Sequence, residues 1–188
     1  MRIVKGRIVR CSSMRVQSVD WEFFLTGVHN NKPLPRVEWR HRLIPSCCTL
    51  QSLWLLRTKG IGAVGTYLAN LRPSRRGFDS MAEPEAIRLG RRESIVCWLV
   101  ARLIDPSLSC LSRSTALTAY LRALGLPAQL VIGRAYFLNN AIYSFHAWTE
   151  MYGTVIDDDE TVPSRYAVIL RLPKDAAIGT TVPVLSAV

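Results

Sequence analysis

The spacing of apolar residues changes once along the chain, at Gly125 and Pro127, and this change restricts the fold more than any other feature. Before it, apolar residues recur at the spacing of one helical face, up to Leu124. After it come short apolar runs between turn residues, which predict strands at residues 130–133, 142–151, 154–158 and 166–172. Helices that precede strands, instead of alternating with them, indicate an α+β fold with N-terminal helices packed on a small antiparallel sheet.

Three helical segments are expected before the strands. Apolar spacing predicts a helix over residues 49–59 with a continuation over 64–71, and then a second helix that ends before Pro106. The second helix is expected to bury one face, formed by Val96, Leu99, Val100 and Leu103. The third helix begins at a cap formed by Ser107 or Ser109, because a serine oxygen can accept a backbone hydrogen bond in the first turn.

The beginning of the chain lacks this regularity. Residues 1–45 are therefore interpreted as an N-terminal extension of unclear role, and residues 46–188 as one domain. No apolar run follows the basic residues within 2–7, so a secretory signal is not predicted. The longest apolar stretch, 94–104, is interrupted by Arg102 and is too short to span a bilayer. These features predict a soluble, cytoplasmic protein.

Cysteine, histidine and charge content limit the kinds of site. The five cysteines form no Cys-x-x-Cys pair and the three histidines are scattered, which favours reduced thiols and argues against a metal site. The formal net charge of +10 indicates either anionic partners or a solvated basic face, and no motif points to nucleic acid.

Residues 60–65 match the Gly-x-Gly-x-x-Gly pattern but follow a helix, so they predict a kink or close helix packing and no cofactor.

Cys110 opens the third predicted helix. A thiol in the first helical turn lies near unpaired backbone N–H groups, and the helix dipole lowers its pKa. The same N–H groups can hold a developing oxyanion. Cys110 is therefore either a nucleophile or a buried structural cysteine, which is a common role of this residue.

His146 lies within the predicted strand 142–151, on the same face as Trp148 and Glu150. A histidine inside such a strand costs free energy unless its ring nitrogens are satisfied. It either bonds to a carbonyl in the core or faces Cys110 as a base, with an acid on its other nitrogen.

Two adjacent aspartates follow a predicted turn at residues 152–153. A hairpin there brings the strand 154–158 back alongside the residues around His146, so that Asp157 or Asp158 can reach the imidazole. A solvated acidic turn is an alternative explanation of this run. A calcium site is less suitable, because the run lacks the alternating acids and the glycine of a calcium loop.

Four segments of the chain follow one another at separations that fit a known family. They are Cys110 to Leu117, Leu121 to Gly125, Val131 to Gly133, and His146 to Glu150 with Gly153 after it. Together they resemble the transglutaminase-like lasso-peptide B proteins, the leader peptidases of lasso-peptide maturation. The resemblance covers about residues 50–172. His-Ala-Trp alone occurs more widely, among transglutaminase-like and papain-like proteins.

The resemblance implies a papain-like or transglutaminase-like core and a cysteine-peptidase triad. By motif position Cys110 is the nucleophile, His146 the general base and Asp158 the orienting acid, with Asp157 as the reserve candidate. The implied reaction is hydrolysis of the leader–core bond in a ribosomally made lasso precursor peptide, after which an asparagine-synthetase-like cyclase closes the ring. Residues 1–45 lack the strands of a leader-recognition domain, so the implied form is a stand-alone peptidase served by a separate leader-recognition protein.

Two other functions are compatible with the same residues. One is a non-catalytic transglutaminase-like scaffold for precursor and cyclase, and the other is acyl transfer to an amine instead of water. Some members of the family are reported to need ATP, but the chain contains no Gly-x-x-x-x-Gly-Lys-[Ser/Thr] phosphate loop that would bind it. No cofactor is predicted on the residues themselves.

Overall fold

The computed structural model divides into two compact units, Met1–Lys32 and Pro33–Val188. In the first unit it describes only the backbone of strands β1 (Ile3–Val4) and β2 (Arg7–Ile8), which pair antiparallel. In the second unit it describes residues 34–73, 78, 81–136 and 145–174. Most of the predicted extension, and the start of the strand predicted at 142–151, lie outside the described residues. The interpretation of residues 1–45 as a separate extension stays a prediction.

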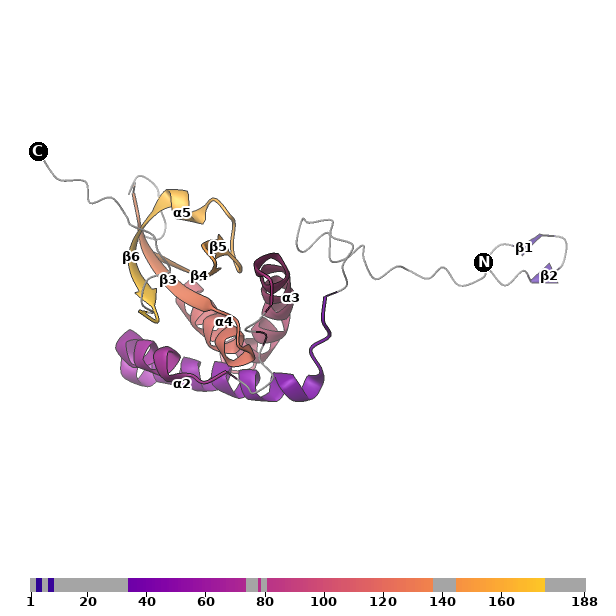
Figure 1. Ribbon diagram of the computed structural model, residues 1–188, viewed down its shortest axis with the longest axis horizontal. Coiled ribbons are helices and arrows are strands. Elements are labelled where there is room, and N and C mark those ends of the chain that lie inside the picture. Colours follow the sequence, from indigo (N-terminus) through magenta and orange to yellow (C-terminus); the bar gives the residue numbers. More distant parts are fainter. Residues whose placement is uncertain are drawn as a thin grey trace, which may run out of the picture. The chain divides into compact units, whose positions relative to one another are not determined.

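The second unit contains helices followed by an antiparallel sheet. Its elements are α2 (Trp39–Asn70), α3 (Glu83–Arg102), α4 (Cys110–Leu124), β3 (Ala128–Ala135), β4 (Phe145–Met151), β5 (Thr154–Val155), α5 (Val162–Arg165) and β6 (Tyr166–Leu172). The strands lie in the order β5-β4-β3-β6, and all neighbours are antiparallel. Helix α4 contacts α2, α3 and the sheet, and it lies between the sheet and α2 (Figure 1). The predicted α+β fold is confirmed.

Helix α4 begins and ends where its cap residues predict. Ser109 is the N-cap, and its side-chain oxygen accepts a hydrogen bond from the Ser112 N–H at 3.2 Å. Gly125 ends the helix in the left-handed conformation with φ 94°, which glycine adopts without a Cβ clash. Of the two predicted caps, the structure therefore uses Ser109. Cys110 becomes the first residue of a helix that is buried over most of its length.

Helix α2 begins at Trp39, not at residue 49, so its predicted start is wrong. An interior Pro45 removes one backbone hydrogen bond, which hid this part of the helix from pattern analysis. Gly60 leaves the helical conformation with φ 74° and ψ −174°, and the helix kinks there. A Cβ on Gly65 would lie 3.0 Å from the Leu172 side chain of β6. The glycine-rich segment therefore provides the predicted kink at Gly60, and its close contact at Gly65 is with a strand of the sheet.

Helix α3 exists as predicted but buries a different face. Leu99 and Leu103, expected in the core, are 64% and 83% exposed. The face that is buried carries Ala86, Leu89, Gly90, Glu93, Ser94, Cys97 and Ala101. The cause is Glu93: its carboxylate is neutralised by Arg42 of α2, so a face that carries a charge can turn inward.

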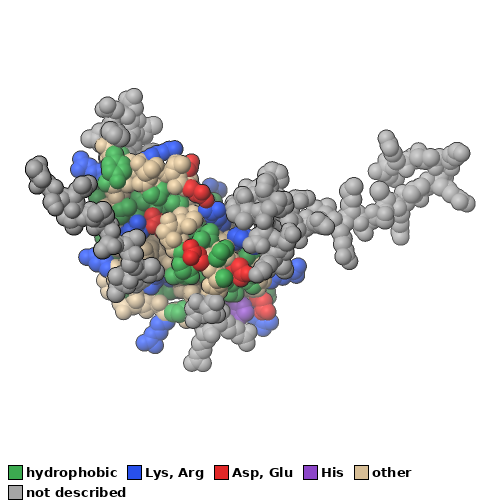
Figure 2. All heavy atoms as spheres, turned by 45° about the horizontal axis from the view of Figure 1, so that its top comes forward, with side chains coloured by type: hydrophobic (Ala, Val, Ile, Leu, Met, Phe, Trp, Pro, Cys, Tyr) green, Lys and Arg blue, Asp and Glu red, His purple; other side chains and the backbone are tan. Residues whose placement is uncertain are grey.

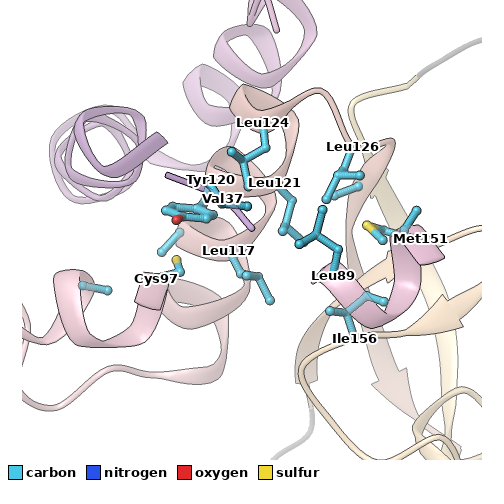
Figure 3. Packing of buried hydrophobic residues seen from close by; sticks show 14 of the residues in the cluster. Val37, Leu89, Cys97, Leu117, Tyr120, Leu121, Leu124, Leu126, Met151 and Ile156 are labelled. Atoms are coloured by element: carbon cyan, nitrogen blue, oxygen red, sulfur yellow. The ribbon is translucent and has the colours of Figure 1, made fainter. Parts of the chain in front are cut away.

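The largest core cluster lies between the helices and one face of the sheet. Figure 3 shows Leu117 and Leu121 of α4 between Tyr120 and Cys97 on one side and Met151 and Ile156 on the other. Burial of each such leucine stabilises the fold by about 1.5–3 kcal/mol.

The outer surface in Figure 2 carries acidic, basic and hydrophobic side chains intermixed, so the positive net charge does not form one continuous patch on that face.

The opposite face of the sheet holds a smaller cluster, which includes Val131, Trp148, Val155 and Val162. Gly133 of β3 makes room for it, because a Cβ there would lie 2.8 Å from both Trp148 and Tyr166. Gly133 is also the partner of His146 in the β3–β4 register. The glycine thus allows aromatic rings to lie directly beside the histidine.

Candidate active site

Cys110 is a free, half-buried thiol at the start of α4. The largest influence on its pKa is a hydrogen bond with His146, which lowers it. Burial acts in the opposite direction, while the backbone N–H groups of Ala147 and Leu111 lower the pKa further. The net result is a thiol with a pKa below its ordinary value, as expected for a cysteine at a helix start beside an imidazole.

His146 lies on β4 between the thiol and a carboxylate. Its Nε2 is 2.9 Å from Oδ2 of Asp158, which leaves Nδ1 as the nitrogen that faces Cys110. The hydrogen bond with the thiol is the main reason why the pKa of His146 is raised; burial lowers it, and Asp158 raises it further. The ring packs against Tyr166 and Trp148, with centroid distances of 5.2 and 6.1 Å. These contacts hold the imidazole plane in place.

Asp158 lies in the bend after β5, not at the end of a strand. The strand predicted at 154–158 ends at Val155. The Ile156 N–H still donates a hydrogen bond to the Thr149 carbonyl, and after it the chain leaves the sheet. Oδ2 of Asp158 faces both His146 and Nη2 of Arg113, each at 2.9 Å.

The pKa of Asp158 reflects these donors. Burial by itself raises the pKa of this carboxyl group. A hydrogen bond from the Asp159 N–H, the contact with His146 and the charge of Arg113 outweigh burial and hold the pKa below the usual range. Asp158 is therefore ionised wherever His146 can be charged, and it can fix the ring tautomer with a proton on Nε2.

Asp157 has a different environment. Its carboxylate accepts hydrogen bonds from the Thr149 N–H at 2.7 Å and the Ser114 hydroxyl at 2.9 Å. Burial raises its pKa, although these hydrogen bonds act in the opposite direction. Asp157 joins the bend to β4 and α4, whereas only Asp158 of the pair hydrogen-bonds the imidazole of His146.

Arg113 is a fourth residue of the site, beside Cys110, His146 and Asp158. It lies one helical turn after Cys110. In the structure its Nη2 pairs with Asp158, and its guanidinium carbon lies 5.6 Å from the ring centre of Trp98. The signal in the sequence was the i, i+3 spacing from the cysteine, which places both side chains at the same end of the helix.

Trp148 does not line an open cleft. Its side chain is fully buried, and its indole N–H donates a hydrogen bond to Glu150 at 2.7 Å. Glu150 in turn pairs with Arg171. Trp148 therefore packs against the ring of His146 from inside the core.

Two further features are absent from the residues that the structure describes. Among the residues that the structure describes, no group of three or more His, Cys, Asp or Glu side chains could hold a metal ion. In the same part of the chain, no helix is long and apolar enough to cross a membrane.

A thiol, an imidazole and a carboxylate in one hydrogen-bonded chain suit acyl-group chemistry through a thioester. Comparison with protein families matches residues 50–171 to the transglutaminase-like superfamily. The chain belongs to this superfamily. The matched range includes Cys110, His146, Asp158 and Arg113 of the transglutaminase-like domain. No individual curated protein and no solved structure matches the chain.

Proposed function

We propose that this transglutaminase-like protein is a cysteine peptidase that removes the leader from a ribosomally made lasso-peptide precursor. The observation that carries the proposal is the hydrogen-bonded chain from Cys110 through His146 to Asp158. The superfamily match supports cysteine chemistry on this fold. The choice of a lasso precursor rests on the sequence resemblance of the four segments around these residues.

The first half of the proposed reaction forms a thioester. His146 accepts the proton of Cys110, and the thiolate attacks the carbonyl carbon of the last leader residue. Backbone N–H groups at the start of α4, which have no partner within the helix, stabilise the oxyanion of the tetrahedral intermediate. The C–N bond then breaks, and the core peptide leaves as an amine that takes the proton from His146.

The second half releases the leader. His146 removes a proton from water, and the resulting hydroxide attacks the thioester carbonyl. The C–S bond breaks, the leader departs as a carboxylic acid, and the proton returns to the thiolate. Asp158 keeps Nε2 of His146 protonated throughout, so that Nδ1 carries the exchanged proton. In this mechanism Arg113 is a positioning residue that keeps Asp158 ionised and in place.

The proposed partners are the precursor peptide, a separate leader-recognition protein and an asparagine-synthetase-like cyclase, all in the cytoplasm. The precursor and the recognition protein supply a direct test. The purified chain is incubated with both, and mass spectrometry follows the appearance of free leader and free core. Cys110→Ala is expected to release none. The control is Cys47→Ala, which removes an exposed thiol of α2 and should cleave at the rate of the unchanged protein. Free core from Cys110→Ala would overturn the proposal.

Acyl transfer to an amine is a second candidate, because the superfamily match and the same three residues are compatible with it. The thioester would then be attacked by an amine in place of water. The same incubation, repeated with an added primary amine, separates the two reactions by mass. A leader that carries the amine would favour transfer, whereas a leader with a free carboxylate would favour hydrolysis.

A further inference from the structure

A cavity of about 330 Å³ lies beside the start of the catalytic helix. We call it the anion pocket, and its walls are formed by Trp98, Arg102, Pro106, Ser107, Leu108 and Arg113. The first two belong to the end of α3, the next three to the connection that leads into Cys110, and the last to α4. Four of the wall residues therefore lie within four positions of the proposed nucleophile in the sequence, and the volume is near the lower limit of ligand sites.

Two of the wall residues carry a buried hydrogen-bond donor that makes no hydrogen bond. The Trp98 indole N–H is buried and makes no hydrogen bond, and Arg113 Nε also makes none but lies 3.8 Å from Oδ2 of Asp157. Arg102 is exposed and forms no ion pair within the described part of the chain. None of the wall residues carries a negative charge. Buried donors without partners cost free energy, so a ligand that offers acceptor oxygens would be stabilised here.

The geometry of the walls favours a carboxylate on a short apolar stem. The Arg113 guanidinium stacks on the Trp98 ring at 5.6 Å, which fixes the orientation of both donor groups. Pro106 and Leu108 supply apolar surface beside them. A guanidinium is also the group that binds a carboxylate through two parallel hydrogen bonds.

We propose that the anion pocket binds an aspartate or glutamate side chain of the peptide substrate close to the scissile bond. The link to cleavage rests on the proposed peptidase function. An internal side chain fits better than a chain terminus, because the substrate must continue past Cys110 on both sides of the cleaved bond. Arg102 and Trp98 are then specificity-determining residues, whereas Arg113 joins the pocket to Asp158.

Binding can be tested without any catalysis. In the full-length protein labelled with ¹⁵N, the indole N–H signal of Trp98 is assigned by its loss in Trp98→Phe. It is then titrated with Ac-Ala-Glu-Ala-NH₂, with Ac-Ala-Gln-Ala-NH₂ and with Ac-Ala-Ala-Ala carrying a free C-terminal carboxylate. The glutamate peptide is expected to shift the signal at lower concentration than both others. Equal titration by the glutamine peptide, or tighter binding of the free C-terminus, would overturn the proposal.

Variants locate the binding site. Arg102→Gln is expected to weaken binding of the glutamate peptide by about 10- to 100-fold, as for loss of a hydrogen bond to a charged group. The matched control Arg40→Gln removes an exposed arginine of α2 and should leave the titration unchanged. An effect of equal size from Arg40→Gln would show general charge attraction and would overturn the assignment.

Turnover gives the second readout. With the precursor as substrate, Arg102→Gln is expected to raise KM by about 10- to 100-fold and leave kcat unchanged, since the lost contact is made before the chemical step. Changing one aspartate or glutamate of the precursor to its amide should raise KM by a similar factor. The same change should raise KM no further when the enzyme already carries Arg102→Gln. Cleavage that requires Cys110 but is unaffected by Arg102→Gln and by every acid-to-amide change in the precursor would overturn the proposed role of the anion pocket alone. Cleavage by Cys110→Ala would overturn the proposed function and leave the peptide titration standing.

Discussion

The molecule contains two clusters in which a carboxylate meets an arginine and a further hydrogen-bonding side chain. At the candidate active site Asp158 meets Arg113 and His146. Between the helices, Glu93 of α3 meets Arg42 of α2 and Tyr120 of α4. The two clusters are similar in composition, but Asp158 keeps 24% of its side-chain surface exposed, whereas Glu93 keeps none.

The pKa shifts in the two clusters have different consequences. At the site the pKa of Cys110 is lowered and that of His146 is raised, mainly through their mutual hydrogen bond, so the two groups are closer in proton affinity than a free thiol and a free imidazole. In the helix cluster, burial and the charge of Glu93 raise the pKa of Tyr120, so it stays a neutral donor. The comparison indicates that the first cluster is arranged to exchange protons and the second to hold helices together.

The largest predicted effect is the loss of turnover in His146→Gln. This variant removes the base and the acid of the proposed reaction, and kcat/KM for precursor cleavage should fall by about 10⁴-fold or more. The free energy of unfolding should change by no more than about 1 kcal/mol, because His146 is only partly buried. Cleavage kinetics and thermal unfolding of the same sample measure both. Retained turnover would show that His146 is not the base of the reaction, and the proposed difference in function between the two clusters would be wrong.

The next effect separates the two adjacent aspartates. Asp158→Asn should lower kcat by about 10²- to 10⁴-fold, because the carboxylate that orients the ring and stabilises its charge is lost. Asp157→Asn should lower it far less, since Asp157 contacts Thr149 and Ser114 in place of the imidazole. A larger loss of kcat in Asp157→Asn would exchange their roles.

Glu93→Gln should lower the stability of the protein but not its turnover, which is the opposite of the result expected for His146→Gln. It leaves Arg42 without its bidentate partner at 2.8 and 2.9 Å, and the free energy of unfolding should fall by about 3 kcal/mol, the lower end for a broken buried pair. Arg42 retains partial exposure, which limits the loss. The kcat of the remaining folded protein should not change. Denaturant unfolding measures the loss, and Arg40→Gln at an exposed pair should cost less than about 0.5 kcal/mol.

The features that sequence reasoning located correctly depend on neighbouring residues. Ser109 and Gly125 cap α4, and their types alone place Cys110 at a helix start. The hairpin turn at Tyr152 and Gly153 has positive φ at both positions, as a tight turn between antiparallel strands requires. The order of helices and strands follows from periodicity. Such local signals do not depend on the rest of the fold.

The features that it missed or left open depend on residues far apart in the chain. The buried face of α3 is decided by the partner of Glu93, which lies on a different helix. The choice between Asp157 and Asp158 depends on the chain leaving the sheet after Val155, which turns one carboxylate toward β4 and the other toward His146. Arg113 acquires its role only once Asp158 lies beside it. None of these contacts has a local pattern.

The smallest predicted effect is on the reactivity of the Cys110 thiol. Because the hydrogen bond with His146 lowers the pKa of the Cys110 thiol, a larger share of this thiol is ionised at a given pH than of a free cysteine, and that share falls as the pH falls through the thiol pKa. In His146→Gln the thiol pKa returns toward about 8.5, so alkylation by iodoacetamide at neutral pH should slow by about 10-fold.

Peptide mapping by mass spectrometry measures the alkylation at each pH, and Cys97 provides an internal control. Burial raises the pKa of Cys97 to about 12, so it should stay unmodified in the folded protein. Equal rates in His146→Gln and the unchanged protein would show that the imidazole does not activate the thiol. If Cys110 does not react at neutral pH in the unchanged protein, the non-catalytic scaffold function would be favoured. The candidate active site would then differ from the helix cluster only in the exposure of its side chains, and not in their reactivity.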